Sequence, residues 1–138
     1  MYLRRLGLYS IVVLLAQLLL GIAVNLWVTI GPHNHWSHIG HVALFAAHGI
    51  VGVAVLLFTF LVLAKAFEES SRRDKVAAAA AFVGVIGAFG CGIGFVSSGG
   101  ASDFSFGMAV GWVVALAANV ILVLPNADSS QATRKVEG

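Results

Sequence analysis

The sequence predicts an all-α integral membrane protein, a four-helix bundle that runs up, down, up and down through the bilayer. Three observations lead to this prediction. Four apolar runs fill the chain, hydrophobic residues make up 59% of it, and only 10% of its residues are charged. Lys and Arg residues lie near the two ends and in one connection between the runs. We therefore expect one transmembrane domain over residues 1–124, followed by a disordered cytoplasmic tail over 125–138.

The predicted spans cover residues 6–30, 41–64, 76–96 and 104–124. Each is long enough to cross a hydrocarbon core, which takes about 20 apolar residues. The first span should end at Gly31-Pro32, because proline cannot continue a helix. Its apolar stretch is longer than the hydrophobic region of a signal peptide, about 7–15 residues, so we expect a retained span.

The later spans carry their own boundary signals. The second continues beyond the membrane into Lys65–Glu69, and Ser71-Arg72-Arg73-Asp74 resembles a capping box that starts the third. Residues 97–101 read as a flexible turn. Ser102 or Asp103 is the expected cap of the fourth span, which should end at Pro125-Asn126.

The basic residues predict the orientation. Between residues 31 and 103 they occur only in the second connection, as Lys65, Arg72, Arg73 and Lys75. The positive-inside rule then places both termini and this connection in the cytoplasm, and the first and third connections outside. We expect a multi-pass protein of a bacterial plasma (inner) membrane.

Composition excludes several function classes. A net charge of +2 gives no signature of nucleic-acid binding. The single cysteine, Cys91, rules out a disulfide within the chain or a paired-cysteine redox centre. Asp, Glu, Lys and Arg are absent from the interior of the predicted spans, which argues against a pump or a proton-coupled transporter. No nucleophile–base pair or carboxylate dyad is visible, which argues against an enzyme with its own catalytic cycle.

Uncharged polar residues and glycines share one face of each span in a helical projection. These faces hold Ser10, Gln17, Gly21 and Asn25; His41, Phe45, His48, Gly52 and Thr59; Gly84, Gly87 and Cys91; and Met108, Trp112, Ala115 and Asn119. By helical rise, Asn25, His48, Cys91 and Met108 fall at one depth toward the outer leaflet. His, Met and Cys ligate haem iron, and sulfur ligands also suit Cu(I). The alternative is structural, because glycines and polar side chains also serve helix packing.

The first connection is rich in histidine. His33, His35, His38 and His41 fall within nine positions and can bind Zn or Cu. No cysteine or carboxylate accompanies them, and histidine also suits a membrane interface without any ligand. Both interpretations stay open.

The chain resembles small b-type haem modules, cytochrome b561 and the four-helix halves of haem A synthase, and uncharacterised four-helix bacterial membrane proteins. The resemblance rests on Gln17 and on His41 and His48 within His-Val-Ala-Leu-Phe-Ala-Ala-His-Gly, and covers mainly the first two spans. It implies a haem b whose second ligand comes from another helix. The third and fourth spans contain no histidine, so a haem here would be held by His48 with Met108, by His48 alone, or by His41 with a loop histidine opposite it.

Three functions follow as hypotheses. The first is haem binding or membrane electron transfer at His48, with Met108, Cys91, Asn25 and His41 as further candidates. The second is a non-catalytic accessory or assembly subunit of a larger membrane complex, or a homo-oligomer. The third is a Cu- or Zn-handling protein that uses the outer histidines.

Overall fold

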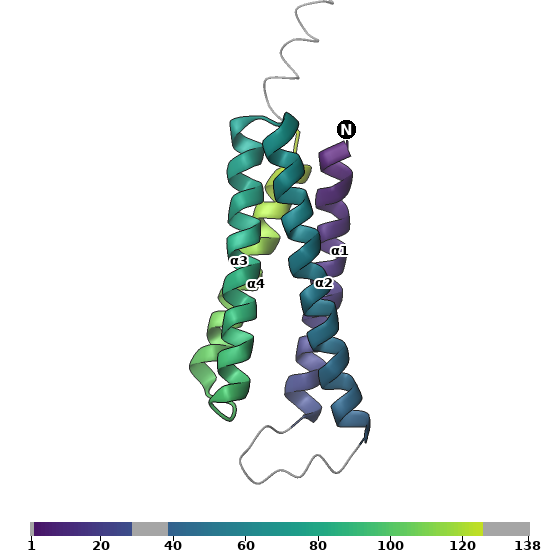
Figure 1. Cartoon of the computed structure of the whole chain (residues 1–138), viewed down its shortest axis with the longest axis vertical. Coiled ribbons are helices and arrows are strands. Elements are labelled where there is room, and N and C mark those ends of the chain that lie inside the picture. Colours follow the sequence, from purple (N-terminus) through teal and green to yellow (C-terminus); the bar gives the residue numbers. More distant parts are fainter. Residues whose placement is uncertain (1, 29–38, 126–138) are drawn as a thin grey trace, which may run out of the picture.

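Four long helices form the structure, a computed structural model that describes residues 2–28 and 39–125 (Figure 1). In chain order they are α1 (Tyr2–Trp27), α2 (Ile39–Glu69), α3 (Arg72–Ser97) and α4 (Ser102–Val123). Within these residues there is no strand. Each helix is long and apolar enough to cross a membrane. The predicted all-α, four-helix, multi-pass membrane fold is therefore confirmed.

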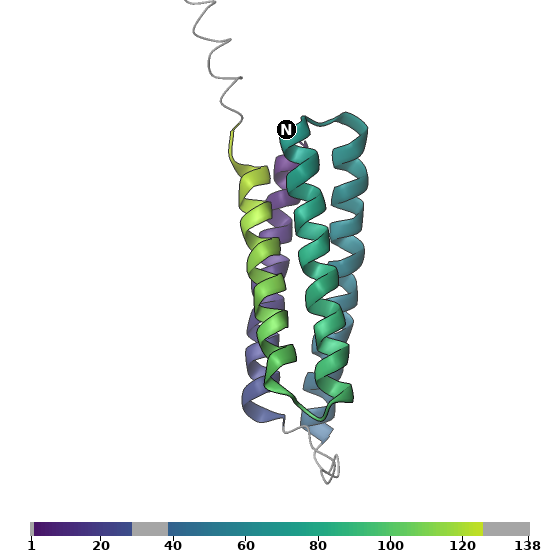
Figure 2. The same ribbon diagram turned by 90° about the vertical axis from the view of Figure 1, so that its left-hand side faces the viewer.

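Successive helices run antiparallel, so that one end of the bundle holds the start of α1 and the end of α4 (Figures 1 and 2). This end carries the basic residues of the described chain, and we call it the basic end: Arg4, Arg5, Lys65, Arg72, Arg73 and Lys75. The opposite, distal end carries the α3–α4 turn. Each helix packs on two others, in the pairs α1·α2, α2·α3, α3·α4 and α1·α4.

The helices extend beyond the predicted spans at several ends, and α1 stops earlier than predicted. It begins at Tyr2 and ends at Trp27, where the prediction placed its end at Gly31. The N–H of Val28 still donates to the Val24 carbonyl oxygen, at 2.8 Å, and so completes the last turn. α2 continues to Glu69, with an i,i+3 ion pair between Lys65 and Glu68 on its final turns. The predicted disordered tail lies outside the described residues beyond Pro125.

The Ser71 cap of α3 is confirmed, whereas the predicted cap of α4 is wrong. Ser71 Oγ accepts from the Asp74 N–H at 3.2 Å and donates to the Asp74 carboxylate at 2.9 Å. The N-cap of α4 is Ala101, not Ser102 or Asp103. Ala101 is held in place because its own N–H donates to Ser98 Oγ. Ser98 belongs to the turn that precedes α4. Its bond to Ala101 makes Ala101 the N-cap, and Ser102 is the first residue of the helix.

The α3–α4 turn is a Schellman motif, which closes the end of α3 with two backbone hydrogen bonds. The N–H of Gly100 donates to the Phe95 carbonyl at 2.8 Å, and that of Gly99 to the Val96 carbonyl at 3.2 Å. Both glycines have positive φ, 72° and 99°, which other residues adopt only at a cost. The segment predicted as flexible thus has a defined hydrogen-bonded geometry.

The buried core includes two layers built from one position on every helix, with further buried residues beside them such as Ala66, Ala77 and Val24. The middle layer comprises Leu14, Val55, Val85 and Ala115. Moving seven residues toward the basic end on each helix gives the basic layer: Gly7, Val62, Ala78 and Leu122. A seven-residue spacing between layers is the geometry of a coiled-coil-like bundle with slightly inclined helices.

The distal half of the bundle is packed differently from the basic half. Among the described side chains, none is buried from Val42 to Ala54 on α2, from Ile86 to Ser97 on α3, or from Ser102 to Val114 on α4. Large apolar side chains such as Leu19 and Phe106 are exposed on the outer surface, as contact with a lipid bilayer requires.

α3 and α4 approach each other most closely at a pair of glycines. A Cβ added to Gly84 would lie 2.6 Å from the Gly111 carbonyl oxygen, and one added to Gly111 would lie 2.5 Å from the Gly84 carbonyl oxygen. The two backbones are therefore in direct contact, which small residues permit in membrane bundles. A separate bond ties α4 to α1, because Trp112 Nε1 donates to the Leu14 carbonyl at 2.9 Å.

Candidate functional site

Gln17 of α1 and His48 of α2 meet in the distal half, between their two helices. Gln17 Nε2 donates to the His48 backbone carbonyl at 3.0 Å and lies 3.5 Å from Nε2 of the His48 ring. A Cβ added to Gly21 would lie 3.1 Å from His48 Cε1, and one added to Gly52 would lie 3.1 Å from Gln17 Nε2. Each polar side chain therefore occupies space left by a glycine of the other helix. We call these four residues the Gln–His contact.

Two polar atoms of this contact are buried without a hydrogen-bond partner in the described structure. They are Oε1 of Gln17 and Nδ1 of His48. Buried polar atoms are usually paired, so these two atoms mark the contact as a candidate binding site. The amide oxygen accepts hydrogen bonds, and a ring N–H of the imidazole donates them.

His48 also belongs to a third layer of the bundle. Moving seven residues from the middle layer toward the distal end gives, on α1 to α4, Gly21, His48, Gly92 and Met108. We call this the distal layer. Neighbouring members of this layer are in contact. A Cβ added to Gly21 would lie 3.1 Å from His48 Cε1, and one added to Gly92 would lie 3.5 Å from Met108 Sδ. The repeat that places aliphatic side chains in the core thus places a histidine, a methionine and two glycines here.

The two potential iron ligands of the distal layer lie on diagonally opposed helices. α1 and α3 each pack on both α2 and α4, while α2 does not contact α4 within the described chain. His48 on α2 and Met108 on α4 therefore occupy one diagonal, and Gly21 and Gly92 the other. Glycine leaves the space that a larger side chain would fill. The layer combines two ligating groups with two sites that have no side chain.

Cys91 lies beside this layer rather than in it. Its Sγ would be 2.6 Å from a Cβ on Gly107, so the thiol fills the α3·α4 contact. It is half-buried and unpaired, as the single-cysteine composition requires. Packing against a glycine is typical of a cysteine that acts as a small apolar residue.

Asn25 does not share the environment predicted for it. Its side chain is exposed, whereas Val24 and Val28 of the same helix are buried. On α1 the seven-residue repeat continues from Gly21 to Val28, and Val24 lies on the same inward face. Asn25 lies beside this face rather than on it.

The outer histidines cannot be placed. His33, His35 and His38 lie outside the described residues, and of His41 the structure describes the helical backbone but not the side chain. Within the described part of the chain, no three His, Cys, Asp or Glu side chains gather as a metal site would require. The Cu or Zn hypothesis therefore stays a prediction.

Two of the buried polar residues in the basic half, Thr59 and Asn119, bond within their own helices. Thr59 Oγ1 donates to the Val55 carbonyl, and Asn119 Nδ2 donates to the Ala115 carbonyl. Ser10 Oγ and Asn119 Oδ1 have no partner among the described residues. None of these groups is a strong metal ligand, so the distal layer is the better candidate site.

Sequence reasoning placed Gln17, Gly21, His48 and Met108 on inward faces but did not single out Gly92. Gly92 stands out only when the seven-residue spacing from Val85 is applied to all four helices together. Comparison of the chain with protein-family models, curated proteins and solved structures finds no match.

Proposed function

We propose that this protein binds one b-type haem across its distal layer, with His48 and Met108 as axial ligands, and carries electrons within the membrane. One observation carries the proposal: on the repeat that builds the core, the distal layer holds a histidine and a methionine on one diagonal and two glycines on the other. In the described structure the His48 ring fills the space beside Gly21 and Met108 Sδ lies at Gly92, so the proposal requires both side chains to turn away from these glycines to admit a flat macrocycle.

Each side chain has a distinct role in this proposal. His48 would hold the iron through one ring nitrogen, and Met108 would hold it through its thioether sulfur. Gln17 would position the imidazole, because its Nε2 donates to the His48 backbone carbonyl and lies 3.5 Å from the ring Nε2. Haem supplies one-electron chemistry, and His/Met ligation raises its reduction potential relative to two histidines.

The proposal includes the orientation in the membrane. The basic end faces the cytoplasm of the plasma membrane, since the Lys and Arg residues of the described chain gather there. The distal layer then lies toward the outer leaflet. A reporter inserted beside Arg72 should be cytoplasmic and a thiol label at Ser98 external; the reverse pattern would overturn the orientation.

Absorption spectroscopy tests the haem site. Protein from haem-replete cells, purified in mild detergent, should show a Soret band and a reduced-minus-oxidised spectrum of a six-coordinate haem. His48→Ala should abolish the band, and Met108→Ala should leave a five-coordinate spectrum. Cys91→Ala and His35→Ala serve as controls and should leave the spectrum unchanged.

Two outcomes would contradict the proposal. A colourless protein that shows no spectral change when haem is added would exclude the haem site. A Soret band that survives His48→Ala but disappears with a loop-histidine variant would move the ligand to the outer histidines.

A further inference from the structure

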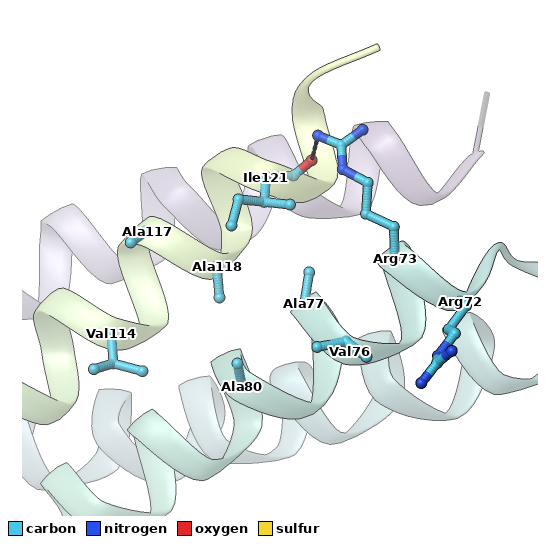
Figure 3. Close-up of a pocket in the computed structure, with 9 residues that line it drawn as sticks. All are labelled: Arg72, Arg73, Val76, Ala77, Ala80, Val114, Ala117, Ala118 and Ile121. Atoms are coloured by element: carbon cyan, nitrogen blue, oxygen red, sulfur yellow. Dashed lines mark hydrogen bonds between the residues drawn. The ribbon is translucent and has the colours of Figure 1, made fainter. Parts of the chain in front are cut away.

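A groove of about 610 Å³ runs between α3 and α4 on the outer surface of the bundle, away from the distal layer (Figure 3). It extends along α4 from Val114 to Ile121, about 10 Å by helical rise. Its lining is almost wholly apolar, and alanines from both helices keep it shallow: Ala77, Ala80, Ala117 and Ala118. The position makes it open to lipid if the helices span the bilayer as proposed.

Two arginines stand at the basic end of this groove. Arg73 reaches across to α4, where its guanidinium donates to the carbonyl oxygens of Ile121 and Pro125 at 3.1 and 3.3 Å (Figure 3). Arg72 also borders the groove, is exposed, and has no hydrogen bond or ion pair within the described residues. Two described carboxylates close to them in sequence have other contacts, because Asp74 accepts from Ser71 and Glu68 pairs with Lys65. The groove therefore has a cationic end and an apolar length.

We propose that this groove binds one anionic phospholipid of the leaflet at the basic end. The phosphate would lie against Arg72, whose side chain points away from that of Arg73 (Figure 3), and an acyl chain along the alanine-lined floor. Charge complementarity selects this occupant, because anionic headgroups attract basic side chains at the membrane surface, by about 1 kcal/mol for each Lys or Arg. An apolar helix of a partner protein would not use the arginines.

Arg72 and Arg73 have different roles in this site. Arg73 already ties the start of α3 to the end of α4, so its replacement would also disturb the helix ends. Arg72 has no such contact and provides the cleaner test. Ala117, exposed on the groove floor, provides the second test, because a larger side chain there occupies the space of an acyl chain.

Native mass spectrometry of the full chain in detergent can measure the binding. The probes are phosphatidylglycerol and phosphatidylcholine with identical acyl chains. We expect one retained phosphatidylglycerol and markedly weaker retention of phosphatidylcholine. Arg72→Gln should weaken phosphatidylglycerol binding about fivefold, the ratio that corresponds to one basic residue at the surface. Ala117→Phe should reduce binding of both lipids.

Matched controls place the same changes outside the groove. Arg4→Gln removes a charge from the basic end on α1, and Ala109→Phe adds an aromatic ring to α4 nearer the distal end. Neither should change lipid binding. Equal binding of the two lipids, or equal losses in Arg72→Gln and Arg4→Gln, would overturn the proposal. A dimer that Ala117→Phe dissociates without loss of phosphatidylglycerol would assign the groove to a second copy of the chain instead.

Discussion

The basic and distal halves of the bundle share one helical repeat and use it in opposite ways. In the basic half, the repeat places buried aliphatic side chains in two layers, with Gly7 as the α1 member of the second. In the distal half, the next step of the same repeat places Gly21, His48, Gly92 and Met108, and the surrounding segments of α2, α3 and α4 bury no described side chain. The difference indicates that the basic half holds most of the buried core, whereas buried side chains of the distal half come mainly from α1, as Val24 and Val28.

The largest expected effect comes from truncating one side chain in the middle layer and one in the distal layer. Leu14→Ala removes a side chain that is only 2% exposed in the middle layer and should cost about 2–5 kcal/mol of unfolding free energy. Met108→Ala in the haem-free protein should cost about 1 kcal/mol or less, because that side chain is half-buried. Unfolding in mixed micelles by titration with SDS measures both. Equal costs would show that the distal layer is a second stabilising core.

A smaller effect is expected where the two halves meet on α3 and α4. Gly111→Ala would put a methyl group 2.5 Å from the Gly84 carbonyl oxygen, where only backbone movement relieves the clash. We expect a loss of about 1–3 kcal/mol in the same unfolding assay.

Gly90→Ala is the matched control for this substitution. No atom lies within 4 Å of its added Cβ, so it should be neutral or stabilising by up to about 1 kcal/mol, the helix preference of alanine over glycine. A destabilised Gly90→Ala variant would mean that a partner or ligand fills the distal half in the folded protein.

The smallest of the three effects concerns the bond that ties α4 to α1. Trp112→Phe keeps the ring packing and removes the donor to the Leu14 carbonyl. The expected loss is about 0.6–1 kcal/mol, the scale of interhelical hydrogen bonds in membranes. If the distal half contributes little stability, Gln17→Leu should change the free energy still less, since Gln17 leaves one buried oxygen unpaired.

Much of the fold could be predicted from local features of the sequence. Apolar length defined the spans, and the Ser71 cap followed from residues three positions apart. Helical periodicity placed Ser10, Gln17 and Thr59 inward, because a face depends only on spacing within one helix. Asn25 was misplaced because the inward face of α1 follows the seven-residue repeat set by contact with its neighbours. The α4 cap was missed because the N–H of Ala101 is held by Ser98, an interaction of the folded turn.

The candidate site could not be predicted from single helices, because its residues depend on the relative heights of all four helices. Depth estimates counted from the span ends grouped Asn25, His48, Cys91 and Met108, whereas the layers match His48 with Gly21, Gly92 and Met108. The relative heights of helices follow from packing at Leu14, Val55, Val85 and Ala115, and this packing becomes visible only in three dimensions. Whether these residues bind haem stays a prediction.

The Gln–His contact has a consequence for how the helices find each other after insertion. Smooth apolar surfaces in lipid match one another almost equally well at several vertical offsets, since hydrophobic burial gives no preference among them. At the observed offset, Gln17 lies opposite Gly52 and His48 lies opposite Gly21, so each polar side chain meets a residue without a side chain. A slip of one helical turn would leave both polar side chains against larger neighbours. The contact would thus select a single pairing of α1 and α2 and prevent misassembly, even if its net contribution to stability were close to zero.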